Sequence, residues 1–181
     1  MLNSKKKIYQ YNIILFCIVF AVFFRIYNIN FDNFWFDEIL SFWITNPEIS
    51  FRESFERHKS IEQIPYLYHF TLKIIFEIFN YESHLGRYLS FFFNILGIFF
   101  ATILCKNIKN NNSYLLALFL FSTNIFLINY SQELRPYSMI FFLCALNLYL
   151  FFKLLTIPRG KKTKSYYFVA MVFSNILMII S

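Results

Sequence analysis

The sequence predicts an all-α membrane protein, a polytopic bundle of transmembrane helices. Hydrophobic residues make up 58% of the chain and fall in long blocks, and there are only three Gly and four Pro to interrupt them. Short clusters of basic residues separate the blocks. This pattern is typical of membrane proteins, because about 20 consecutive apolar residues in a helix cross a bilayer.

The formal net charge of +7 does not point to nucleic acid. The basic residues lie between apolar runs rather than along one face, so membrane topology explains them better. The three cysteines, Cys17, Cys105 and Cys144, lie inside apolar runs without paired spacing or a neighbouring His. We therefore expect packing roles for them, with neither a disulfide framework nor a zinc site.

Five segments are predicted to span the membrane, and they cover approximately residues 8–29, 85–105, 114–128, 136–155 and 166–181. The first is too long for the core of a signal peptide and lacks a small-residue cleavage site, so we expect it to be retained. Arg25, near its far end, is expected to extend to the lipid headgroups. Because the last run stops with the chain, we expect a fragment or truncated product of a longer protein.

A polar loop, residues 30–84, follows the first span and is expected to carry short interfacial helices. Within it, residues 65–79 have apolar side chains at helical spacing, while His69, Lys73 and Glu77 fall four apart on the other face. That segment is too short to span comfortably, so it is predicted to lie in the membrane interface.

The positive-inside rule gives an orientation in which the N-terminus is cytoplasmic. With that choice, the basic residues between later spans also become cytoplasmic, namely Lys106, Lys109, Lys153, Arg159, Lys161, Lys162 and Lys164. The polar loop and the stretch "NYSQELRPYS", residues 129–138, then face the outside of the cell membrane.

The stretch "NYSQELRPYS" places Arg135 directly before Pro136, a residue that suits the first turn of a helix. The positive end of that helix and the guanidinium would together form a seat for a phosphate at headgroup depth. The alternative is that Arg135 anchors the helix to lipid headgroups and that Glu133 pairs with it.

The pair Asp37-Glu38 lies within "FWFDEILSFW", just after the first span. It has a structural interpretation, since Asp is a favoured N-cap and a short amphipathic helix can follow it. In the functional interpretation, one carboxylate takes a proton from an acceptor hydroxyl. Aromatic neighbours such as Trp35 and Trp43 would hold that carboxylate at the depth of the lipid interface.

Arg87 is predicted to lie at the external end of the second span, on the same side of the membrane as Asp37 and Arg135. It would either anchor the helix to lipid headgroups or form a second contact with the phosphate. A divalent cation could in principle be bound by His58, Glu62 and His69 together with Asp37 or Glu38. However, the spacing of these residues matches no recognised metal-binding motif. We therefore predict no metal site, and a divalent cation as cofactor is left open. The sequence also has no Gly-rich phosphate loop and no Ser/His/Asp set.

Three stretches in order carry a resemblance to a known family: "FRIYNINFDNFWFDEILSFW", "IPYLYHFTLKIIFEIFNYESHLGRYLSFFFNILGIF" and "NYSQELRPYSMIFFLCAL". Together they resemble the N-terminal part of the dolichyl-phosphate-mannose-protein mannosyltransferase-like glycosyltransferases (family 39 type) of the GT-C superfamily, which include bacterial relatives of the aminoarabinose lipid A transferases. The resemblance covers nearly all of the chain. One departure is Tyr66, which stands where the family has a second Pro.

The resemblance implies a GT-C-like bundle in which Asp37 and Glu38 form the catalytic region, with Asp37 as the base. It also implies that Arg87, Arg135, Glu133 and Tyr137 bind the donor phosphate. The expected partners are a sugar linked to polyprenyl phosphate, a lipid, glycan or protein acceptor, and membrane lipids.

The expected function is a membrane glycosyltransferase that moves the sugar to an acceptor hydroxyl at the external face, with inversion. Two alternatives belong to other classes: a non-catalytic or truncated membrane protein, and a piece of a transporter or flippase. A transporter would place ionisable residues near the bilayer midplane and often break its helices there.

Overall fold

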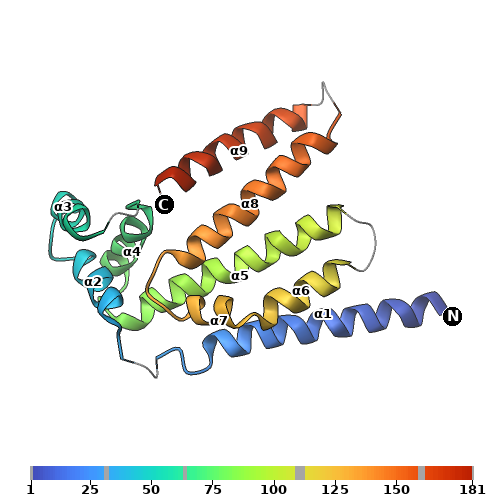
Figure 1. Cartoon of the computed structure of the whole chain (residues 1–181), viewed down its shortest axis with the longest axis horizontal. Helices are drawn as coiled ribbons and strands as arrows, with labels where there is room; N and C mark the ends of the chain where they lie inside the picture. The colour runs from blue at the N-terminus through green and yellow to red at the C-terminus, as the bar shows by residue number, and fades with distance from the viewer. Residues whose placement is uncertain (1, 31–32, 63–64, 109–112, 159–161, 181) are drawn as a thin grey trace.

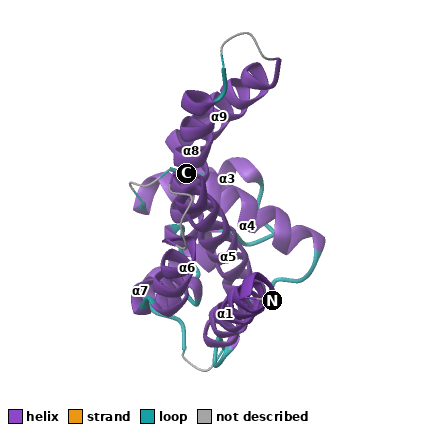
Figure 2. Cartoon of the chain, turned by 90° about the vertical axis from the view of Figure 1, so that its right-hand side faces the viewer, coloured by secondary structure: helices purple, strands orange, loops and turns teal. Residues whose placement is uncertain are grey.

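The computed structural model describes residues 2–30, 33–62, 65–108, 113–158 and 162–180. Every regular element in these ranges is a helix and none is a strand, as Figure 2 shows. The prediction of an all-helical chain is therefore confirmed for the described residues. Lys109, Arg159 and Lys161, which contributed to the predicted orientation, lie outside them.

Four helices are long and apolar enough to cross a membrane: α1 (Leu2–Ile26), α5 (Ser83–Ile108), α8 (Tyr137–Thr156) and α9 (Lys162–Ile180). α8 lies between α5 and α9 in the bundle (Figure 1). Many of their apolar side chains, such as Phe168 on α9, are exposed. Exposed apolar helices of this length are those of a multi-pass membrane protein.

The predicted span over residues 114–128 is divided in the structure. α6 (Ser113–Thr123) and α7 (Ile125–Ser131) meet at an angle of 56°. Asn124 lies at the break, where its side chain accepts a hydrogen bond from the backbone N–H of Leu127 at 3.0 Å. An Asn that caps a new helix in this way competes with continuation of the old one, which explains why a continuous apolar run forms two helices.

Arg25 lies against this break and does not extend to the headgroups, so that prediction is wrong. Its side chain is fully buried and donates to the backbone oxygens of Phe121 and Ser122, both at 3.0 Å. Its Nε donates to Asn94 Oδ1 on α5 at 2.8 Å. The last carbonyls of α6 have no partner within their own helix, and the guanidinium supplies one.

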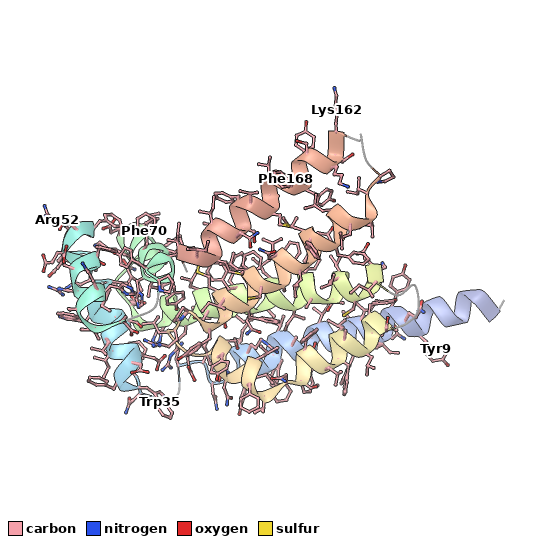
Figure 3. All side chains as sticks on the ribbon, turned by 45° about the horizontal axis from the view of Figure 1, so that its top comes forward. Tyr9, Trp35, Arg52, Phe70, Lys162 and Phe168 are labelled. Atoms are coloured by element: carbon pink, nitrogen blue, oxygen red, sulfur yellow. The ribbon has the colours of Figure 1, made fainter. Side chains whose placement is uncertain are left out.

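Three short helices gather at one end of the bundle, away from the N-terminus (Figure 1): α2 (Phe36–Ile44), α3 (Phe51–Ile61) and α4 (Leu67–Ile78). Nitrogen and oxygen atoms are concentrated around them in Figure 3, whereas the long helices carry mostly carbon. A core formed by Tyr68, Leu72 and Phe76 of α4 joins this end to α5 and α8.

The face of α4 that carries His69, Lys73 and Glu77 is partly buried. Lys73 is fully buried and donates to the backbone oxygens of Asn46 and Ile49, at 2.9 and 2.8 Å, while Glu77 pairs with it at 3.0 Å. The lysine thereby supplies hydrogen bonds to the turn between α2 and α3. A buried charge is tolerated there because its donors are occupied.

Candidate functional site

Glu38 and Arg87 form a buried ion pair where α2 meets α5. Arg87 donates from Nε to Glu38 Oε1 at 3.0 Å and from Nη2 to Oε2 at 2.9 Å. The same guanidinium donates to the backbone oxygen of Ile29 at 2.7 Å, so it also fixes the chain just after α1. This two-pronged geometry is the strongest form of an arginine–carboxylate contact.

Two backbone N–H groups complete the surroundings of the Glu38 carboxylate. Leu134 N–H donates to Oε1 at 2.8 Å, and Trp35 N–H donates to Oε2 at 3.2 Å. The contact with Trp35 closes the first turn of α2, so Glu38 rather than Asp37 caps this helix. With four donors directed at it, Glu38 ties together α2, α5 and the segment before α8.

Asp37, the neighbouring carboxylate, has the opposite environment. Its side chain is 61% exposed, and its Oδ2 lies 4.0 Å from Nη2 of Arg135. The structure therefore gives the two acidic residues separate positions: Glu38 is enclosed and fully bonded, whereas Asp37 is open to a ligand.

Arg135 is held mainly by Glu62, a residue that the sequence interpretation linked only to metal binding. Its Nη1 lies 2.5 Å from Glu62 Oε1, and its Nη2 lies 3.5 Å from Oε2. The alternative in which Glu133 pairs with Arg135 is therefore not what the structure shows. Arg135 also lies 5.8 Å from the ring centre of Tyr137, the first residue of α8.

Two adjoining polar pockets open beside these residues. One has a volume of about 200 Å³ and is lined by Arg87 and Gln132 among others. The other, of about 70 Å³, is lined by Asp37, Arg135 and Tyr137 among others. Trp35, Glu38 and Glu133 line both, so the two pockets share a wall.

Glu133 is the half-buried carboxylate in that shared wall. Partial burial, reinforced by the nearby negative charges of Glu38 and Asp37, raises the pKa of Glu133 above its ordinary value. Arg135 and Arg87 act in the opposite direction but do not outweigh burial. Glu133 is thus positioned to exchange a proton or to bind a hydroxyl group in the pocket.

A second set of residues positions this site, and the sequence interpretation did not identify it. Asn94 donates to Leu127 O at 3.0 Å and to Ser138 Oγ at 3.2 Å, and Ser138 in turn donates to Tyr130 O at 2.9 Å. Gln132 donates to backbone oxygens at the end of α1, including that of Tyr27 at 2.9 Å. No spacing pattern indicates these contacts, although Gln132 and Ser138 fall inside the stretch already noted.

His58 and His69 lie side by side, with ring centres 4.9 Å apart. Nε2 of His69 is 3.2 Å from Ser41 Oγ. Burial, together with the positive charges of His58 and Arg135, lowers the pKa of His69 to about 3. Among the described residues, no three His, Cys, Asp or Glu side chains are close enough to hold a metal ion.

The structure thus brings Asp37, Glu38, Arg87, Glu133, Arg135 and Tyr137 to one place, from three separate parts of the chain. These features describe a helical bundle whose long apolar helices could cross a membrane several times, with a polar, partly charged site at one end. No protein-family model, curated protein or solved structure matches the chain.

Proposed function

We propose that this protein is a membrane glycosyltransferase of the GT-C type, which moves a sugar from polyprenyl phosphate to an acceptor hydroxyl outside the cytoplasm. The observation that supports the proposal is the difference in environment between Asp37 and Glu38. One carboxylate is exposed beside an arginine, and the adjacent one is fixed by Arg87 and two backbone N–H groups. That arrangement presents a single aimed base on a rigid support.

In the proposed reaction, Asp37 takes the proton of the acceptor hydroxyl as its oxygen attacks the anomeric carbon. The bond from that carbon to the phosphate oxygen breaks, and its electrons leave with the polyprenyl phosphate. A single displacement of this kind inverts the configuration at the anomeric carbon. A phosphate is a good leaving group, so it requires charge stabilisation more than a proton.

Arg135 is the residue best placed to stabilise the leaving phosphate. Its guanidinium borders the 70 Å³ pocket with Asp37 and Tyr137, beside the proposed base, whereas Arg87 lines the other pocket. Glu62 holds Arg135 in position from the other side. The site lies at one end of the apolar bundle, where a polyprenyl tail can stay in lipid while its phosphate enters the pocket.

Transport is the second candidate, because the α6–α7 break and the buried Arg25 are features expected of a transporter. However, Arg25 bonds to Asn94 and to backbone oxygens of α1 and α6, and these contacts account for its donors. Its position near the end of α1 is also far from the middle of that helix. These contacts support a structural role for the break.

The test uses undecaprenyl phosphate as the probe, since the sugar is not specified. We expect the purified protein to bind it, and we expect Arg135→Gln to weaken binding by roughly tenfold or more, the usual effect of losing a charged hydrogen bond. Arg52→Gln is the matched control, because Arg52 is an exposed arginine on α3 at the same end (Figure 3). Equal affinities in all three proteins would contradict the proposal.

A further inference from the structure

A long apolar groove runs between α1, α5 and α6, away from the candidate site. Its volume is about 360 Å³, and its walls include Ile18, Val22, Ile98 and Leu118. On α5 the lining extends from Ile95 to Lys106, which corresponds to about 16 Å along a helix axis. That length is roughly half the hydrocarbon thickness of a bilayer, or the depth of one leaflet.

The groove ends in polar groups at the end of the bundle opposite α2–α4. Lys106 and Tyr114 line that end, at the last turn of α5 and the first turn of α6, and Lys106 Nζ lies 5.6 Å from the tyrosine ring centre. One turn earlier on α5, the hydroxyl of Thr102 is buried and has no hydrogen-bond partner within the described residues. The groove is therefore apolar along its length, with a positive charge at one end.

We propose that this groove binds one anionic diacyl phospholipid from the leaflet opposite the candidate site. One acyl chain lies along the apolar walls, and the phosphate lies against Lys106. A flexible chain with a negative group at one end matches both the length of the groove and its charge. This inference does not depend on the proposed glycosyltransferase activity.

A neutral lipid would fill the apolar part but would leave Lys106 without a counter-ion. The charge at the groove's end therefore selects an anionic headgroup.

The test is native mass spectrometry of the purified protein with phosphatidylglycerol or phosphatidylcholine of identical acyl chains. We expect one tightly retained phosphatidylglycerol and a preference over phosphatidylcholine of roughly fivefold, the usual effect of one basic residue at a membrane surface. Lys106→Gln should bring the preference close to one. Lys162→Gln should leave it unchanged, because Lys162 is exposed at the same end but lies on α9, outside the groove (Figure 3).

A groove-filling variant supplies an independent readout. Val22→Trp should abolish retention of both lipids, and the thermal unfolding curve should show that the variant is folded. If it does not fold, Ile18→Trp fills the same space from a more exposed position on α1. Equal retention of the two lipids by the unmodified protein, or a preference that survives Lys106→Gln, would overturn the proposal. So would a loss of preference in Lys162→Gln.

Discussion

Arg87 on α5 holds both carboxylate oxygens of Glu38 on α2, although 49 residues separate them in the chain. Both side chains are almost entirely buried, at 6% and 2% exposure. The pair fixes the exposed Asp37 next to Arg135, because Asp37 precedes Glu38 in the first turn of α2. A structural ion pair thus sets the geometry of the proposed catalytic residue.

Glu38→Gln should destabilise the protein strongly, because the Arg87 guanidinium would remain buried without its counter-ion. Breaking a buried pair costs about 3–5 kcal/mol, which corresponds to a fall in Tm on the order of 10 °C for a chain of this size. Thermal unfolding in detergent measures the change. Asp37→Asn is the matched control and should shift the Tm little, since that side chain is exposed. Similar shifts in the two variants would argue against the structural role of Glu38.

Gly86→Ala should distort the site by displacing Leu134. A Cβ at this position would lie 1.6 Å from Cδ1 of Leu134, the residue whose N–H bonds to Glu38. Such overpacking costs about 1–3 kcal/mol, and it should also weaken undecaprenyl phosphate binding because Leu134 must move. Combining it with Leu134→Ala removes the colliding atoms and should restore part of the binding. Unchanged undecaprenyl phosphate binding by Gly86→Ala would show that the close packing of Gly86 against Leu134 has no functional consequence.

The buried His69 should make the protein sensitive to acid. Its pKa of about 3 in the folded state lies below the ordinary 6.5, so the unfolded state binds the proton more readily between these values. Its contribution to stability is complete above about pH 6.5 and is lost as the pH falls towards 3. Unfolding measured across this range should show a weaker pH dependence for His69→Gln. His84→Gln, which changes an exposed histidine, should retain the full dependence.

The site should face the outside of the cell and the lysine-rich end should face the cytoplasm. A cysteine in place of the exposed Phe36 should react with a membrane-impermeant thiol reagent added to intact cells, whereas one in place of Lys106 should react only after permeabilisation. The native cysteines Cys17, Cys105 and Cys144 lie within helices long and apolar enough to span a membrane. They are replaced by Ala in both labelling variants, because Cys105 adjoins position 106. The reverse labelling pattern would place Asp37 in the cytoplasm and end the proposed assignment.

The helical class and the positions of the long helices could be predicted because lipid imposes a simple rule on composition and length. The division into α6 and α7 could not, since it depends on Asn124 and on Arg25 reaching across from α1. Similarly, helical spacing indicated that Lys73 lies in the polar stripe of an interfacial helix. It could not reveal the carbonyl groups of Asn46 and Ile49, which accept hydrogen bonds from the lysine.

The candidate site was likewise predictable only in part from the sequence. Acidic and basic residues at helix ends, such as Asp37 and Arg135, could be recognised from their unusual positions between apolar runs. Their partners could not be, because Arg135 pairs with Glu62 and Glu38 accepts the N–H of Leu134 through contacts that only the fold creates. The sequence alone also left open which carboxylate was structural, and burial distinguishes Glu38 from Asp37.

The most direct test of the central claim is sugar transfer from labelled undecaprenyl-phosphate mannose, with a panel of other sugars on the same lipid, in membranes that contain the protein. The unmodified protein should transfer a sugar to an endogenous acceptor. Asp37→Asn should lower transfer by at least about a hundredfold, the contribution of a general base, while its Tm and undecaprenyl phosphate binding stay unchanged. Transfer at the unmodified rate by Asp37→Asn would contradict the account.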